Sequence, residues 1–205
     1  MVNQEQVLEI LHAVGEKITE EKLFLTELDN VIGDGDHGIN LARGFAEIEK
    51  KMMEGKDIGT MLKTAGMALV STVGGASGPL YGTAFMQAGK ALAGKTELDA
   101  QDLVTILDAF VAGVQLRGKS VAGEKTMLDA MIPARDAVKA ALDAGKSVKD
   151  ALVDGVAAAE QGVAYTKTII ATKGRASYLG ERSLGHQDPG ATSFTTMLKV
   201  VAERV

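Results

Sequence analysis

Three carboxylates and an imidazole stand among three glycines between residues 28 and 40. On a continuous helix Asp29 and Asp34 would point about 140° apart and would not meet. We therefore expect the helix to end near Gly33 and a tight loop to bring Asp29, Asp34 and Asp36 to one point. Like charges so close repel unless a cation neutralises them, and an all-oxygen donor set suits Mg²⁺ or Ca²⁺. The spacing predicts a metal site.

A local explanation exists for single acids, because aspartate favours helix N-caps and turns. Asp34 or Asp36 alone would then only cap the following helix. Three acids with Asn40, and without a neighbouring Lys or Arg, favour a metal instead. No Glu stands at the twelfth loop position, as an EF-hand requires, so Mg²⁺ with phosphates completing its coordination fits better than Ca²⁺.

His37 follows the acids directly and is expected in a loop. Its ring would donate a hydrogen bond to a phosphate or act as an acid–base group. The alternative is an unremarkable surface histidine. A role as metal ligand is disfavoured, since hard cations prefer oxygen.

A second glycine-rich segment runs from Val73 to Thr83. Glycines allow the backbone to approach a ligand closely, Pro79 suits the first turn of a helix, and Ser77 is the expected N-cap. Such a helix N-terminus binds phosphate. The Gly-Lys-Ser/Thr ending of a Walker motif is missing, so the segment alone is a weak signal. Beside a Mg²⁺ site it indicates a nucleotide polyphosphate.

The polar stretch 173–190 is long for a loop in a compact domain, which is typical of a functional or a disordered segment. Tyr178 and Leu179 give it apolar side chains to pack, and Asp188 with Pro189 predicts a new helix start. Arg175 is a candidate phosphate clamp. For two further residues we expect only packing within the loop, namely Arg182 and His186.

Met127, at the start of a later helical segment, has two interpretations. It is either a soft wall for an adenine ring or an ordinary core methionine at helical spacing.

Apolar residues recur at helical spacing almost throughout, so the sequence predicts an all-α protein. The first helix is expected to end near Gly15 and the second to follow Thr19 as N-cap. A kink is expected at Pro133. The remaining expected helices span 38–53, 58–73, 79–92, 103–118, 126–142, 148–172 and 189–204.

Glycines cluster at 33–38, 74–78, 118–123 and 174–190. Alternate loops of an up-and-down bundle fall at the same end, so all four clusters can share one functional end. The alternative is that each glycine is a helix C-cap.

The chain of 205 residues, without cysteine and with a formal charge of −5, fits one domain over residues 1–205. The acidic charge argues against nucleic acid as a partner. No signal peptide or membrane span is visible, so we expect a soluble cytoplasmic protein.

Four motifs in this order resemble the DhaL family, the nucleotide-binding subunits of phosphotransferase-system-dependent dihydroxyacetone kinases. The matching strings are Gly33 to Gly38, Val73 to Pro79, Lys125 to Met127 with Asp129, and Gly174 to Ser183 followed by Asp188 to Ala191. ATP-dependent dihydroxyacetone kinases share most of them. One small departure is Glu124, where the family would have Asp.

The resemblance implies an eight-helix antiparallel barrel with ADP at one end and two Mg²⁺ ions held by Asp29, Asp34 and Asp36. This count is one fewer than the nine helical segments expected above, so one segment should be short or broken. The implied nucleotide contacts are His37, Gly38, Ile39, Asn40, Ala76, Ser77, Gly118, Met127, Arg175, Asp188, Pro189 and Gly190.

The implied activity is a phosphoryl relay, in which bound ADP cycles to ATP between a DhaM-type phosphohistidine donor and dihydroxyacetone on a DhaK-type partner. Phosphoryl transfer needs positioning and charge neutralisation more than covalent chemistry, which agrees with the residues present. Two alternatives are a conventional kinase domain that exchanges ATP and ADP freely, and a non-enzymatic nucleotide-responsive module that contacts a transcriptional regulator.

Overall fold

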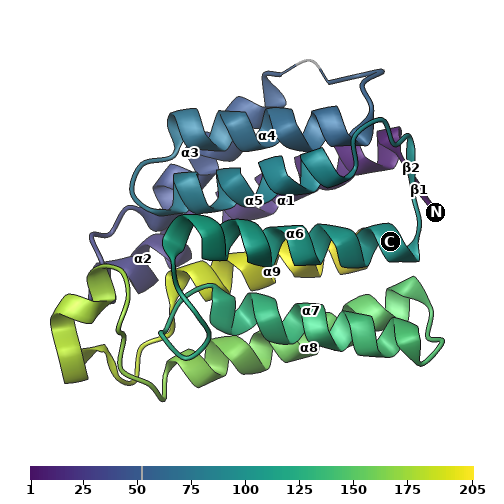
Figure 1. The fold of residues 1–205 in the computed structure, drawn as a ribbon. Coiled ribbons are helices and arrows are strands. Elements are labelled where there is room, and N and C mark those ends of the chain that lie inside the picture. Colours follow the sequence, from purple (N-terminus) through teal and green to yellow (C-terminus); the bar gives the residue numbers. More distant parts are fainter. Residues whose placement is uncertain (52) are drawn as a thin grey trace.

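The computed structural model describes residues 1–51 and 53–205, and helices account for nearly all of its regular structure (Figure 1). Two short strands, β1 (Val2–Asn3) and β2 (Glu97–Leu98), pair antiparallel. The helices are α1 (Gln4–Glu20), α2 (Lys22–Ile32), α3 (His37–Glu49), α4 (Ile58–Thr72), α5 (Ser77–Ala91), α6 (Ala100–Gly118), α7 (Leu128–Asp143), α8 (Val148–Thr166), the 3₁₀ segment η1 (Arg175–Ser183) and α9 (Pro189–Arg204). The expected all-α class is confirmed.

Eight of the α-helices in the described residues form a closed ring. Its order is α1, α3, α4, α5, α6, α7, α8 and α9, and α9 packs back against α1 (Figure 1). The remaining helix, α2, follows α1 after one residue and packs against α3 and α9 at one end of the ring. The ninth helical segment expected from the sequence is thus a short helix beside the ring.

Local sequence explains where most helices begin. Asn3, Asp57, Asp99, Ser147 and Asp188 each accept a hydrogen bond from a backbone N–H of the following first turn. Such side chains satisfy donors that a helix start leaves unpaired. The expected start at Asp188 and Pro189 is confirmed.

The expected first boundary is wrong, because α1 continues through Gly15 to Glu20. Its buried face continues past Gly15 to Ile18, and packing of that face outweighs the local cost of one glycine. Thr19 is not an N-cap. It lies inside α1 and donates to the carbonyl of Gly15.

Two other ends differ from expectation. Helix α8 ends at Thr166 instead of residue 172. At this end the Lys125 ammonium donates a hydrogen bond to the Thr166 carbonyl. Helix α3 ends at Glu49 instead of residue 53, and Met52 lies outside the described residues. Helix α7 is continuous across Pro133.

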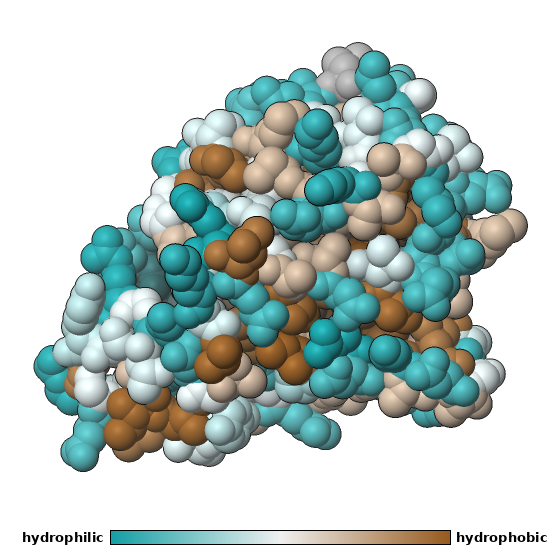
Figure 2. All heavy atoms as spheres, viewed as in Figure 1, coloured by the Kyte–Doolittle hydropathy of each residue, from teal (hydrophilic) through white to brown (hydrophobic). Residues whose placement is uncertain are grey.

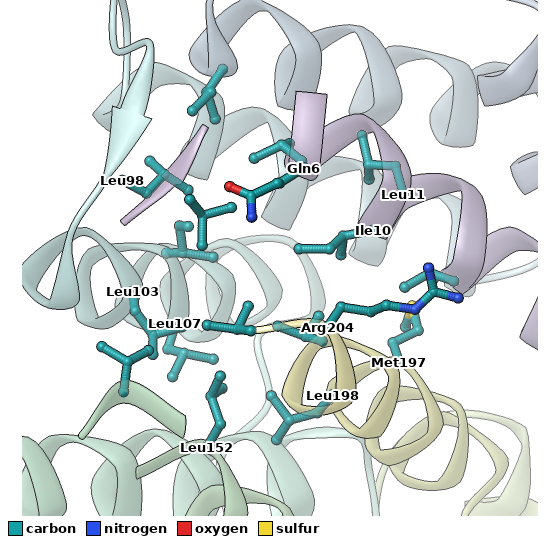
Figure 3. A pocket seen from close by; sticks show the side chains of 18 of the residues that line it. Gln6, Ile10, Leu11, Leu98, Leu103, Leu107, Leu152, Met197, Leu198 and Arg204 are labelled. Atoms are coloured by element: carbon teal, nitrogen blue, oxygen red, sulfur yellow. The ribbon is translucent and has the colours of Figure 1, made fainter. Parts of the chain in front are cut away.

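A largely apolar cavity of about 520 Å³ lies at the end of the ring that holds both chain termini. Figure 3 shows Ile10 of α1, Leu103 and Leu107 of α6, Leu152 of α8 and Leu198 of α9 around it. The helices therefore pack incompletely at this end. Among the described residues, every helix is too short or too polar to cross a bilayer.

Candidate functional site

A second cavity, of about 450 Å³, opens at the opposite end of the ring. The end of α2, the starts of α3, α5, α7 and α9, the end of α6 and the start of η1 all contribute to its wall. Each of the four glycine clusters supplies at least one lining residue, for example Gly33, Gly75, Gly118 and Gly174. The expectation that the clusters share one end is confirmed.

The three acids meet on this wall. Asp29, Asp34 and Asp36 each place a carboxylate oxygen within 4.8 Å of the other two. Asp29 is buried at the end of α2, and its Oδ2 accepts hydrogen bonds from the backbone N–H of Asp36 at 2.9 Å and of His37 at 3.1 Å. These bonds fold the loop back onto the helix end. The oxygen-only cluster is suited to a hard divalent cation.

Two glycines make this loop possible. A Cβ at Gly33 would overlap the Asp29 carboxylate, and Gly35 has a φ of +71°. A positive φ of this size favours glycine, and only a residue without a side chain fits beside the Asp29 carboxylate.

A cationic partner of the acids comes from a distant part of the chain. Arg175, at the start of η1, places its Nη2 2.8 Å from Oδ2 of Asp34. The acids have no neighbouring Lys or Arg in the sequence, but the fold supplies one from a distant segment. Local spacing carried no signal of this pair, because the two residues are far apart in the sequence.

His37 is buried, so the surface-histidine alternative is wrong. Its Nδ1 lies 2.9 Å from the Ser77 hydroxyl and its Nε2 2.9 Å from the Ser193 hydroxyl. Burial lowers the pKa of His37 to about 4 and outweighs the opposing effect of Asp29 and Asp34. The ring is therefore neutral near pH 7 and engaged at both nitrogens.

The start of α5 faces the cavity through Gly75, Ala76 and Ser77. Ser77 is the first helical residue and Ala76 holds the N-cap position. Among the described residues, no side chain caps this helix. The expected N-cap role of Ser77 is wrong, because its hydroxyl bonds to His37 instead. The uncapped start is the type of helix end that binds anions.

The motif Lys125-Thr126-Met127 is connected to the segment between α8 and α9 by hydrogen bonds of its lysine. Lys125 is buried, has a φ of +61°, and donates to the carbonyls of Thr166 and, at 2.6 Å, His186. Burial lowers the pKa of Lys125, and the negative charges of Asp188 and Asp129 oppose this effect. Lys125 thus joins the loop before α7 to both ends of the segment between α8 and α9. The sequence showed the motif but not this role.

Asp188 caps α9 by accepting from the N–H of Ala191 at 2.7 Å. Burial raises the pKa of Asp188 to about 7, with repulsion from Asp129 and Asp29 adding to the rise and Lys125 opposing it. This carboxyl lines the cavity and is therefore half protonated near neutral pH.

The other expected site residues divide into two groups. Gly118, Met127, Arg175, Pro189 and Gly190 line the cavity. Met127 is both a core residue and a wall residue, so its two interpretations are compatible. Gly38, Ile39 and Asn40 lie in the first turn of α3. Unlike the adjacent His37, they are not part of the cavity wall.

The long loop is ordered through Ala176, Leu179 and the buried Ser183, whose hydroxyl accepts from the N–H of Ala171. Tyr178 does not pack as expected and is 86% exposed. Arg182 and His186 are exposed and outside the cavity wall.

Two functional candidates were missed. Tyr81 and Ser193 are buried behind His37, and their hydroxyls lie 2.8 Å apart. Tyr81 belongs to the glycine-rich segment, but Ser193 follows 112 residues later. No sequence pattern links them.

Comparison with known proteins agrees with this geometry. Residues 31–203 match the family model described as DAK2 domain. The chain is 48% identical over 203 residues to "PEP-dependent dihydroxyacetone kinase 1, ADP-binding subunit DhaL" of Listeria innocua, covering 98% of this chain and 96% of the relative. It is 42% identical over 203 residues to the corresponding ADP-binding subunit DhaL of Escherichia coli, covering 98% of this chain and 97% of the relative.

A solved structure is also similar. The dihydroxyacetone kinase from C. freundii in complex with AMP-PNP and Mg²⁺ matches with a TM-score of 0.70 and 27% identity, covering 95% of this chain. This chain spans 33% of that kinase chain. From motifs, fold and full-length similarity together, the chain belongs to the DAK2 domain family and, within it, to the DhaL subunits of dihydroxyacetone kinases.

Proposed function

We propose that the chain is the ADP-binding subunit of a dihydroxyacetone kinase. It would receive a phosphoryl group from a phosphohistidine on a DhaM-type partner and deliver it to dihydroxyacetone on a DhaK-type partner. The observation that carries the proposal is the cluster of Asp29, Asp34 and Asp36 in the same cavity as the uncapped start of α5. Such a cavity neutralises and positions phosphates, which is the main requirement of phosphoryl transfer.

The three aspartates would hold two Mg²⁺ ions. All three would offer oxygen ligands, and Asp29 is fixed in place by two backbone hydrogen bonds. Bound Mg²⁺-ADP would supply the phosphate oxygen that carries the phosphoryl group, with its charge neutralised by the metal. Arg175 would leave Asp34 and turn to the phosphates, since a guanidinium binds carboxylate and phosphate in similar ways.

The rest of the nucleotide would contact the expected set of wall and first-turn residues. The N-termini of α3 and α5, with His37 to Asn40 and with Ala76 and Ser77, would face the phosphates. Gly118 and Met127 would contact the base, and the segment from Asp188 to Gly190 would close the site.

The partners would dock on the rim of this cavity. The end of the molecule that carries the cavity exposes Leu116, Val121, Ile170 and Leu184. Figure 2 shows hydrophobic patches over this part of the surface, among hydrophilic residues. Exposed apolar patches of this type are suited to transient protein contacts. The relay would operate in the cytoplasm, where a phosphotransferase-system donor is available.

A second candidate function is a kinase domain that exchanges ATP and ADP freely. The similarity to the C. freundii kinase solved with AMP-PNP and Mg²⁺ favours it. The two functions differ in nucleotide residence time, because a relay must retain ADP between turnovers while a conventional kinase must release it.

A single-turnover transfer assay tests the proposal. The purified chain with Mg²⁺ and ADP is mixed with an isotopically phosphorylated DhaM-type donor, and label on dihydroxyacetone is followed after a DhaK-type subunit is added. We expect transfer with the wild type and its loss in Asp34→Asn. The matched control is Asp143→Asn, an exposed aspartate at the end of α7, which should transfer normally. Equal transfer by both variants would contradict the proposal.

A further inference from the structure

Four side chains form one hydrogen-bonded series that leads from the core to the cavity wall. The Tyr81 hydroxyl lies 2.8 Å from Ser193 Oγ, which lies 2.9 Å from His37 Nε2. His37 Nδ1 lies 2.9 Å from Ser77 Oγ. Ser77 and His37 line the cavity, whereas Tyr81 and Ser193 do not. The series joins the starts of α3, α5 and α9.

The inner end of the series is a proton donor. Tyr81 is fully buried, and burial raises the pKa of its hydroxyl, which stays protonated. The carbonyl of Gly190 lies 3.1 Å from both the Tyr81 and the Ser193 hydroxyl, so it competes as acceptor. The Tyr81–Ser193 contact is shorter and matches the usual O–H···O distance. This geometry favours donation from Tyr81 to Ser193. The Ser193 proton then has two acceptors, His37 Nε2 at 2.9 Å and the Gly190 carbonyl at 3.1 Å, and the shorter contact favours His37.

The contact with Ser193 determines which ring nitrogen of His37 carries the proton, and this in turn determines how the Ser77 hydroxyl at the outer end is oriented. A neutral imidazole has one N–H donor and one acceptor nitrogen. If Nε2 accepts from Ser193, the proton is on Nδ1 and points to Ser77 Oγ. The Ser77 hydroxyl then accepts from the ring and keeps its own proton for a group in the cavity. In the opposite tautomer, with the proton on Nε2, the Ser77 hydroxyl would donate its proton to His37 Nδ1. The oxygen lone pairs of Ser77 would then face a bound anion.

We propose that Ser193 and Tyr81 are positioning residues for the phosphate site, which hold His37 with its proton on Nδ1 so that Ser77 donates into the cavity. The inference rests on the proposed nucleotide function and extends it to two residues that do not contact the nucleotide. A hydrogen bond to a charged phosphate oxygen is stronger than one between neutral groups, so the orientation of one hydroxyl has a measurable effect.

The first test is the affinity for Mg²⁺-ADP by titration calorimetry. Ser193→Ala and Tyr81→Phe should each weaken binding about 3- to 10-fold, the effect of one hydrogen bond. In a Ser77→Ala background, neither substitution should weaken binding further, because the hydroxyl that they orient is gone. Full additivity with Ser77→Ala would overturn the inference.

The matched control is Thr195→Val. Thr195 is a buried residue of the same helix whose hydroxyl donates to the carbonyl of Ala191. The substitution removes a buried hydroxyl without touching the series, so affinity should stay at the wild-type value. If Thr195→Val weakens binding as much as Ser193→Ala, the effect is general loosening of α9 and the inference is wrong.

The second test does not depend on nucleotide binding. Two-bond proton–nitrogen spectra of the nucleotide-free protein report the tautomer of each of its three histidines. We expect the Nδ1–H form for His37 in the wild type and a shift toward Nε2–H in Ser193→Ala. A wild-type Nε2–H form, or no change in Ser193→Ala, would overturn the inference. If instead the tautomer behaves as expected but Mg²⁺-ADP does not bind, the proposed function fails and the hydrogen-bonded series stands.

Discussion

At the level of single residues, the contact between Arg175 and Asp34 connects the start of η1 to the acidic loop. The Arg175 guanidinium forms an ion pair with the Asp34 carboxylate, which the proposed Mg²⁺ would also need as a ligand. Arg175 should therefore compete with Mg²⁺ for the Asp34 carboxylate before nucleotide binds, and should bind the phosphates of the nucleotide afterwards.

Arg175→Gln should consequently have opposite effects on the two ligands. The affinity for Mg²⁺ without nucleotide should rise several-fold, since the competing charge is removed. The affinity for Mg²⁺-ADP should fall about 10-fold or more, the effect of a charged hydrogen bond. Calorimetric titrations measure both. Arg182→Gln, in the same segment but outside the cavity wall, is the control. A fall in both affinities would show that Arg175 does not compete with the metal.

The Asp188 carboxyl should make the protein less stable as pH rises. Its pKa in the folded protein is about 7, above the value near 3.9 of an unfolded chain. Between these values the folded state retains a proton that the unfolded state has lost, so the free energy of unfolding falls from about pH 4 to about pH 7.

Asp188→Asn should remove this dependence, because asparagine is as good an N-cap and does not titrate. Without Mg²⁺ and nucleotide, the variant should be more stable than the wild type at pH 8 by at least about 1.4 kcal/mol, the equivalent of one pKa unit. The advantage should vanish near pH 4. Urea unfolding at both pH values measures this difference, and a constant difference would refute the role of Asp188.

Individual site residues were predictable where the motif is local. Asp29, Asp34 and Asp36 converge as their spacing indicated, because two glycines and one fold-back loop suffice. The Arg175 pair and the Ser193 partner of His37 were not predictable, since each depends on how distant helices pack.

At the level of helices, close packing of α4 against α5 depends on small residues. A Cβ at Gly82 would lie 2.7 Å from the carbonyl oxygen of Gly66 and would overlap Val70. In contrast, a Cβ at Gly15 of α1 would lie 3.4 Å from the nearest atom, on Phe45.

The same substitution should therefore have opposite effects at these two sites. Gly82→Ala should destabilise the protein by about 1–3 kcal/mol, because the helices must move apart. Gly15→Ala should stabilise it by about 0.5–1 kcal/mol, because alanine favours a helix over glycine. Chemical denaturation measures both. Destabilisation of similar size at both sites would rule out helix contact as the cause.

Most helix starts were visible in the sequence, because they are set by local caps. The boundary between α1 and α2 was not. Glu21 separates them, and its carboxylate accepts a hydrogen bond from Thr196, 175 residues away. Such a boundary depends on tertiary contacts that spacing does not encode.

At the level of the whole molecule, the two ends of the ring have different roles. One end carries the cavity that holds the three aspartates, and the other carries the apolar cavity beside the termini. The shared end of the glycine clusters was predictable from the alternation of loops in an up-and-down bundle, whereas the eight-helix barrel was expected only from the family resemblance. The apolar cavity was not, because it depends on how completely side chains fill the interior.

Substitution at the apolar end should change stability without changing the site. Leu152→Ala should cost about 2–5 kcal/mol of unfolding free energy by enlarging the cavity around this fully buried residue. The affinity for Mg²⁺-ADP should remain that of the wild type. Thermal unfolding and calorimetry test the two expectations together, and a parallel loss of affinity would show that the ends are coupled.

The most direct measurement is the nucleotide content of the purified protein. The chain is isolated in Mg²⁺ buffer and denatured, and the released nucleotide is identified by chromatography. We predict ADP at nearly one equivalent per chain, and its loss in Asp34→Ala. A wild-type protein that is empty and binds ATP reversibly would contradict the relay and favour a conventional kinase. A protein that binds neither nucleotide would contradict the assignment of the acidic loop itself.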